Sequence, residues 1–282
     1  MKVNKVAVVG AGTMGGEIAH AVTSANLPVV LKDVDQRFVD IGLERAATLR
    51  NKLVEKGKLD PAESDRRAGL IQGAVDYAAF GDVDLVIEAV PEKLAIKQAV
   101  FAELDAATPG HTVLATNTSA LSIDEIAAAT VRPEMVVGLH FFYPAAVMRL
   151  VEVVEGSATS RKTLQTTYNF AQAIKKLPVI CSDSPGFVVN RVLTATMSEM
   201  FNFQAEHDLS PEELDEFVVN SGLSPMGPCK LGDRLGLDTV MHVAEYLNET
   251  LGDTFTVSQQ MRELVAAGDF GRKTGKGFYE YG

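Results

Sequence analysis

The sequence of 282 residues has no tryptophan, only two cysteines, and few aromatic residues, which make up 7% of the chain. Cys181 and Cys229 could pair in principle, but a chain of this length needs no disulfide framework, so we expect both thiols to be reduced. No apolar run approaches the roughly 18 residues of a membrane-spanning helix. The first predicted strand begins by Val3, which leaves no room for a signal or transit peptide. We therefore expect a cytoplasmic protein without a membrane partner.

Positive charge is scarce, since 26 lysines and arginines stand against 37 aspartates and glutamates, for a formal net charge of −11. An acidic chain is a poor candidate for binding nucleic acid, because the phosphates repel it. The histidines are scattered without the spacing of metal ligands, so we expect no metal site. They are His20, His111, His140, His207 and His242. The hydrophobic content of 46% is normal for a folded protein of one large domain or two ordinary ones.

The clearest pattern lies near the N-terminus, in the stretch KVAVVGAGTMGGEIA. The apolar run Val6–Val9 is typical of a central parallel strand buried on both faces. Gly10, Gly12 and Gly15 follow with GxGxxG spacing, which permits a tight turn, close approach of a pyrophosphate, and packing of a helix on the strand. The N-terminus of that helix would bind the phosphates. The pattern predicts a dinucleotide site, and the alternative is a strand-to-helix turn that binds no ligand.

Asp33 indicates which dinucleotide is bound. A second apolar strand, 28–33, ends in this acid, which lies 18 residues after Gly15 (33 − 15). A separation of roughly 20 residues is expected for a carboxylate that binds the adenosine ribose. The carboxylate would repel a 2′-phosphate, and no arginine follows until Arg37. We therefore predict NAD rather than NADP as the cofactor.

Strands and helices alternate up to about residue 183, which predicts a doubly wound, Rossmann-type α/β domain. After 184 the strand-like runs vanish and amphipathic helices take over, so we expect two domains, 1–183 and 184–282. In the first domain, strands are also expected at 83–90, 112–116, 135–140, 150–154 and 178–181, and helices at 36–58, 92–104, 161–176 and from Pro61, with Asp60 as its cap. In the second, helices are expected up to about 205, from a capping box at 210–213 and at 237–251, with a loop-rich segment at 222–236.

Several basic residues lie on or just after the predicted helix 36–58. They could form an ordinary solvated face or contact an anionic ligand, and the sequence favours neither. These residues are Arg45, Arg50, Lys52, Lys56 and Lys58.

His140 ends a predicted strand, at the edge of an open α/β sheet where ligands bind. A neutral imidazole can accept a hydroxyl proton, and a carboxylate on its other nitrogen would fix the tautomer. Glu152 lies 12 residues downstream (152 − 140) on the next strand, so the intervening segment can return it to His140. From spacing alone, this pair could equally be a structural histidine and an unrelated glutamate.

Five stretches, together with the start GAGTMGGEIA, resemble the L-3-hydroxyacyl-CoA dehydrogenase family, which includes the 3-hydroxybutyryl-CoA dehydrogenases. They are NTSALSIDEIA (117–127), GLHFFYPAAVMRLVEVV (138–154), DSPGFVVNR (183–191), PMGPCKLGDRLGLD (225–238) and GRKTGKGFYEYG (271–282). The similarity runs from end to end. It implies an NAD enzyme of fatty-acid oxidation or butyrate-type metabolism, with an acyl-CoA thioester in a cleft between two domains and a homodimer formed through the helical C-terminal domain.

The resemblance also implies roles for particular residues. His140 matches the catalytic base and Glu152 its carboxylate partner. Ser119 matches the serine that binds the 3-oxygen of the substrate, and Asn190 matches an active-site asparagine. The expected cofactor contacts are Gly10, Gly12, Thr13, Met14, Gly15, Asp33, Glu92, Lys97, Asn117, Ser119 and Tyr143.

The CoA end of the substrate is expected near Thr48 and Lys56. One position departs from the family, whose usual motif is HFFNP, because this chain has HFFYP with Tyr143. A tyrosine hydroxyl can donate or accept a hydrogen bond, but its ring is bulkier than an amide. The acyl-chain preference could therefore differ, or the ring could rotate and pack in the core.

Two other functions are compatible with parts of this pattern. A dehydrogenase of free 3-hydroxy acids would use the same cofactor domain without a CoA site. A noncatalytic NAD- or CoA-binding protein would have no need of a base, whereas His140 and Glu152 are both present. The sequence therefore favours the acyl-CoA enzyme.

Overall fold

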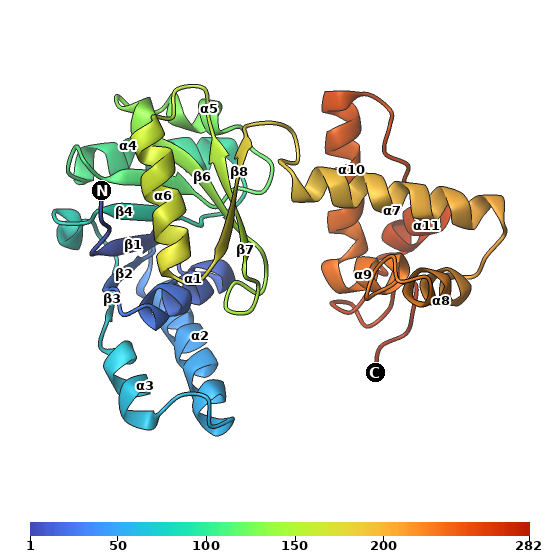
Figure 1. Ribbon diagram of the computed structural model, residues 1–282, viewed down its shortest axis with the longest axis horizontal. Coiled ribbons are helices and arrows are strands. Elements are labelled where there is room, and N and C mark those ends of the chain that lie inside the picture. Colours follow the sequence, from blue (N-terminus) through green and yellow to red (C-terminus); the bar gives the residue numbers. More distant parts are fainter. The chain divides into compact units, whose positions relative to one another are not determined.

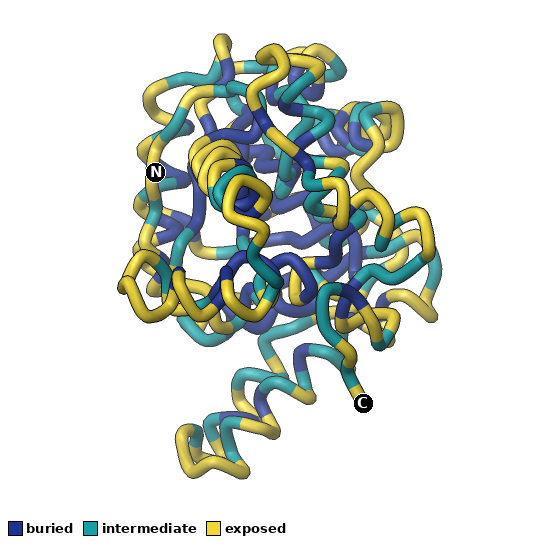
Figure 2. The backbone as a smooth tube through the Cα atoms, turned by 90° about the vertical axis from the view of Figure 1, so that its right-hand side faces the viewer, coloured by how far each residue is buried: buried dark blue, intermediate teal, exposed yellow.

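The computed structural model describes residues 1–282 and divides the chain into two compact units, Met1–Phe187 and Val188–Gly282. Each unit has its own buried apolar core. Figure 1 shows the elements of both units, and Figure 2 marks the buried parts of the backbone in dark blue. The boundary between the two units lies after Phe187, a few residues beyond residue 183, where the sequence pattern changes. Both cysteines are free thiols, as predicted. No helix is long and apolar enough to cross a membrane.

The first unit is built on one eight-stranded sheet with the order β3-β2-β1-β4-β5-β6-β7-β8. Strands β1 to β6 are parallel, β7 runs antiparallel to β6, and β8 is parallel to β7. The strands are β1 (Val6–Val9), β2 (Val29–Lys32), β3 (Ile71–Ala74), β4 (Leu85–Glu88), β5 (Val113–Thr116), β6 (Val136–Phe141), β7 (Leu150–Glu155) and β8 (Leu177–Ser182). The predicted doubly wound α/β fold is therefore confirmed.

Helices cover both faces of this sheet, because apolar side chains of β1, β4 and β5 point alternately to either side. Helices α1, α2 and α6 pack on one face, while α4 and α5 pack on the other (Figure 1). The helices are α1 (Thr13–Ser24), α2 (Gln36–Glu55), α3 (Pro61–Ala68), α4 (Leu94–Ala107), α5 (Ile123–Ala127) and α6 (Arg161–Ala173). Asp60 caps α3 as predicted, whereas β3 and α5 were not predicted.

The second unit is entirely helical, as predicted. Its helices are α7 (Val189–Glu206), α8 (Pro211–Asn220), α9 (Pro228–Leu235), α10 (Leu237–Leu251) and α11 (Gln259–Ala267). Ser210 and Glu213 form the expected capping box of α8. The prediction of a loop-rich segment at 222–236 was wrong in part, because Pro228 begins the helix α9 at a position where its missing N–H costs nothing.

Two buried carboxylates fix the C-terminal tail of the second unit. Asp233 accepts hydrogen bonds from the backbone N–H groups of Phe278 and Tyr279 and from the hydroxyl of Tyr281, each at 2.9 Å. Asp215 accepts a hydrogen bond from the Tyr279 hydroxyl at 2.8 Å. The tail is therefore part of the helical unit and not a free extension.

Candidate active site

The glycine turn has the geometry that a dinucleotide requires. Gly10 has φ +98°, and a Cβ on Gly15 would lie 1.8 Å from the carbonyl oxygen of Gly10, so both positions need glycine. Gly12 is the N-cap of α1 and gives it no side-chain cap, and nothing lies within 4 Å of a Cβ built on it. The first N–H groups of α1 are thus open to a pyrophosphate. Thr13 is exposed and Met14 is half-buried.

Asp33 lies directly beside this turn. Its carboxylate accepts a hydrogen bond from the backbone N–H of Ala11 at 2.7 Å and another from that of Val34 at 2.7 Å. The nearest following arginine, Arg37, is paired with Asp35 through bonds of 2.9 and 3.0 Å. The residues present therefore fit NAD, because an open glycine turn and a fixed carboxylate bind its pyrophosphate and adenosine ribose.

The carboxyl ends of β4, β5 and β6 are joined by polar side chains. The Asn117 backbone N–H donates to the carbonyl oxygen of Glu88 at 2.8 Å, and the Asn117 side chain accepts from the Phe141 N–H at 2.8 Å. Glu92 accepts hydrogen bonds from the Ser119 N–H at 2.7 Å and from the Thr118 hydroxyl at 2.5 Å. The turn after β5 is thus held at this edge of the sheet.

Lys97 reaches the same edge from α4. Its ammonium group lies 2.7 Å from Glu88 and 3.2 Å from Glu92, and its side chain is almost fully buried. The structure therefore brings the predicted residues Glu92, Lys97, Asn117 and Ser119 together. Sequence reasoning missed Glu88, although a glutamate at the end of the apolar run DLVIEAV is an available signal for a buried, partnered charge.

His140 and Glu152 are a buried pair. They are directly opposite each other in the antiparallel register of β6 and β7, and Glu152 Oε2 lies 2.8 Å from His140 Nδ1. The rings of Phe142 and Phe187 lie 4.5 and 6.0 Å from the imidazole, centre to centre. The carboxylate fixes the orientation of the imidazole, which leaves Nε2 as the nitrogen that can exchange a proton with a ligand.

Tyr143 is 62% exposed, so of the two alternatives for its ring, packing in the core does not hold. Its hydroxyl lies 3.4 Å from Nη2 of Arg45, on α2. Arg45 also donates from Nε to the buried carboxylate of Glu17, on α1, at 3.1 Å. The tyrosine hydroxyl thus reaches α2 from the loop after β6.

The basic residues on or just after α2 differ in their exposure to solvent. Arg45 is paired with Glu17, and Arg50 is buried, where desolvation lowers its pKa. Lys52, Lys56 and Lys58 are exposed, as is Thr48. These three lysines are therefore open to solvent or to an anionic ligand. Asn190 lies on α7, in the second unit.

This fold and this site together define a dehydrogenase of the NAD-dependent class. The model of the 3-hydroxyacyl-CoA dehydrogenase NAD binding domain matches residues 5–184, and that of the 3-hydroxyacyl-CoA dehydrogenase C-terminal domain matches residues 186–281. The chain belongs to the 3-hydroxyacyl-CoA dehydrogenase family, and it is an NAD-dependent oxidoreductase.

The similarity to known proteins extends over the whole chain. A 3-hydroxybutyryl-CoA dehydrogenase of Clostridioides difficile is 42% identical over 278 residues, which are 98% of this chain and 99% of that protein. The crystal structure of the (S)-3-hydroxybutyryl-CoA dehydrogenase PaaH1 of Ralstonia eutropha has a TM-score of 0.95 and 38% identity, with all of both chains covered. The alpha subunit of a Psychrobacter fatty acid oxidation complex is 38% identical over 281 residues, 99% of this chain, but only 39% of that protein is covered.

Proposed function

We propose that the protein oxidises L-3-hydroxyacyl-CoA thioesters to 3-ketoacyl-CoA with NAD, and that it catalyses the reverse reaction with NADH. The observation that carries this proposal is the buried His140–Glu152 pair, 2.8 Å apart at the carboxyl edge of an NAD-binding sheet. The naming of relatives as 3-hydroxybutyryl-CoA dehydrogenases supports a four-carbon substrate. Fatty-acid oxidation or butyrate-type metabolism in the cytoplasm is the proposed setting.

In the proposed mechanism, His140 removes the proton of the substrate hydroxyl through Nε2. Glu152 stabilises the imidazolium that results, as a carboxylate does in other base-carboxylate pairs. Ser119 binds the 3-oxygen of the substrate. Held by the glycine turn and Asp33, NAD would supply the acceptor for the C3 hydrogen as hydride, so that the substrate, having lost a proton and a hydride, becomes a ketone. Phe142 and Phe187 keep the imidazole in an apolar setting, which strengthens its attraction to Glu152.

The CoA end is proposed to bind at α2. Thr48 is exposed on this helix and Lys56 is exposed directly after it, so a hydroxyl and an ammonium group are available to phosphate oxygens. Asn190 is proposed to bind the substrate near the thioester.

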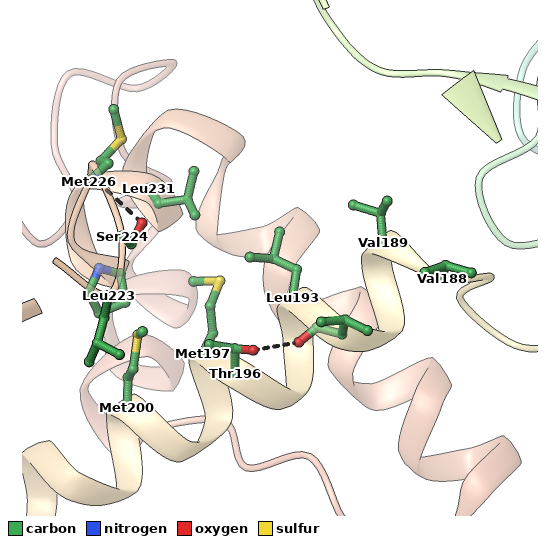
Figure 3. Close-up of a pocket in the computed structure, with 12 residues that line it drawn as sticks. Val188, Val189, Leu193, Thr196, Met197, Met200, Leu223, Ser224, Met226 and Leu231 are labelled. Atoms are coloured by element: carbon green, nitrogen blue, oxygen red, sulfur yellow. Dashed lines mark hydrogen bonds between the residues drawn. The ribbon is translucent and has the colours of Figure 1, made fainter. Parts of the chain in front are cut away.

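The second unit is proposed to form a homodimer. It carries an apolar hollow of about 350 Å³ between α7 and the segment 223–231. In Figure 3, Leu193, Met197 and Met200 of α7 face Leu223 and Leu231 across this hollow. An open apolar surface of this kind is typical of an interface, and a second copy of the same unit is the proposed occupant.

A substrate comparison tests the proposal. NADH oxidation is followed with acetoacetyl-CoA, with a longer 3-ketoacyl-CoA and with free acetoacetate. We expect turnover with the thioesters only, and competition by free CoA. Equal turnover of free acetoacetate, without competition by CoA, would favour the dehydrogenase of free acids.

Tyr143→Asn restores the usual family residue, and we expect it to raise the relative rate with the longer thioester.

A further inference from the structure

Glu88 is a fully buried carboxylate for which the mechanism above has no use. It ends β4, and its oxygens accept three hydrogen bonds of 2.7 Å, from the Lys97 ammonium group, the Val90 N–H and the Thr116 hydroxyl. Removing a charge from water is costly, and a buried ion pair often adds little net stability compared with apolar side chains. A saturated set of hydrogen bonds does, however, fix the position of each member.

Glu88 is connected to the substrate side of the site through one lysine. Lys97 lies between two carboxylates, since its Nζ is 2.7 Å from Glu88 and 3.2 Å from Glu92. Glu92 in turn holds the Ser119 N–H at 2.7 Å. The chain of contacts therefore runs from β4 through α4 to the turn after β5. Glu88 and Lys97 are buried, and Glu92 at its end is exposed.

We propose that Glu88 is a positioning residue for the dehydrogenase reaction and that it acts through Lys97 and Glu92 on Ser119. With Glu88 present, the Lys97 ammonium group is shared between Glu88 and Glu92. One oxygen of Glu92 then remains free to accept the hydrogen bond from the Ser119 N–H. Without that charge, Lys97 is attracted by Glu92 alone and draws its carboxylate away from the turn. The inference rests on the proposed function, because it requires that Ser119 binds the substrate oxygen.

The test is a double-mutant cycle in the full chain, with Glu88→Gln and Glu92→Gln alone and combined. We expect Glu88→Gln to lower kcat for acetoacetyl-CoA on the order of 10- to 100-fold, because small displacements at a reacting centre have effects of that size. The Kd of NADH should change by a much smaller factor than kcat, although Lys97 and Glu92 are themselves expected cofactor contacts. If Glu88 acts through Glu92, the double variant is no slower than Glu92→Gln alone.

Asp105→Asn is the matched control. Asp105 of α4 forms another ion pair, largely buried, with Arg132, and neither residue belongs to the site. This variant should lose thermal stability but keep its kcat. Bound NADH can be measured by the change in its own fluorescence, since the chain has no tryptophan whose quenching could be followed instead.

The outcomes are distinct. Normal turnover by Glu88→Gln, or losses that multiply in the double variant, would overturn the positioning role. Absence of turnover in the wild type would count against the proposed function instead. If Glu88→Gln does not fold, Thr116→Val keeps the charge of Glu88 and removes two hydrogen bonds of the Thr116 hydroxyl, one to Glu88 and one from the Thr118 N–H. We expect a smaller loss of kcat in this variant, again absent in the Glu92→Gln background, and an unchanged kcat would overturn the proposal.

Discussion

His20 and Arg50 are the two residues of the chain with a buried side-chain nitrogen that has no hydrogen-bond partner, Nδ1 of His20 and Nη1 of Arg50. His20 lies on α1 and is 5% exposed. Burial lowers its pKa from 6.5 to about 4, and the positive charge of Arg50 contributes in the same direction. The imidazole is therefore neutral inside the folded protein over the range in which it takes up a proton in the unfolded chain.

This difference predicts a loss of stability in mild acid. Below pH 6.5 the unfolded chain binds a proton that folded His20 does not bind until about pH 4, so the free energy of unfolding falls as pH falls through this window. From pH 7 to pH 5 the contribution of His20 should be about 2 kcal/mol. Urea unfolding at both pH values, for the wild type and His20→Gln, measures it as the difference between the two proteins. An equal loss in both would show that His20 does not titrate in this way.

At the residue scale, the spacing of His140 and Glu152 left their pairing open, and the family resemblance implied it. His140 and Glu152 face each other because one turn joins β6 to β7 and the register places them opposite. The link from Glu88 through Lys97 to Glu92 could not be predicted, because it depends on how α4 packs on the sheet. The packing of Tyr143 was also open, since the position of its hydroxyl depends on Arg45 of a distant helix.

At the element scale, two substitutions in the glycine turn and α1 should have different effects, one on cofactor binding and the other on folding. Gly12→Ala adds a methyl group where nothing lies within 4 Å, so the turn should keep its structure while the pyrophosphate loses its closest approach. Gly15→Ala forces a Cβ to 1.8 Å from the Gly10 carbonyl oxygen, which the packing of α1 on β1 cannot accommodate. We expect a normal Tm with NADH binding weakened at least about tenfold for Gly12→Ala, and a Tm lowered by several degrees for Gly15→Ala.

Thermal unfolding and NADH titration of both variants provide the measurement. Unweakened NADH binding by Gly12→Ala would contradict the placement of the cofactor at this turn, and an unchanged Tm for Gly15→Ala would contradict the described packing.

Regular elements were predictable where one physical signal was strong. Apolar runs located β1 and β4, and the cap, proline and glutamate at 210–213 located the start of α8. Strand β3, with the sequence IQGA, escaped prediction because it is an edge strand with no buried residue. Helix α9 escaped because its flanking glycines and Pro228 are typical of loops, while tertiary packing of the segment decides its structure.

At the scale of the whole molecule, the two-domain architecture followed from the change of pattern near residue 184, but the assembly did not. Leu223 and Val192 border the apolar hollow of the second unit and are 68% and 60% exposed. Their exposure supports the proposed homodimer, and the structure of a single chain does not test it. The proposed homodimer is therefore a question for measurement in solution.

Leu223→Asp should prevent this homodimer, because a carboxylate in the apolar hollow would lose its water on association. We expect the mass in solution to change from that of a dimer to that of a monomer, as measured by sedimentation or light scattering. Val131→Asp is the control, since Val131 is 93% exposed and belongs to the first unit. A Leu223→Asp protein that stays dimeric would place the interface elsewhere.

The central claim is that His140, held by Glu152, exchanges the hydroxyl proton of the substrate. The most direct test is the kcat of His140→Gln with acetoacetyl-CoA, measured together with NADH affinity. We predict a kcat lower by roughly 10²- to 10⁴-fold, the usual contribution of a general base, and an NADH Kd within about threefold of the wild type. A kcat close to that of the wild type would contradict the account, because some other group would then have to move the proton.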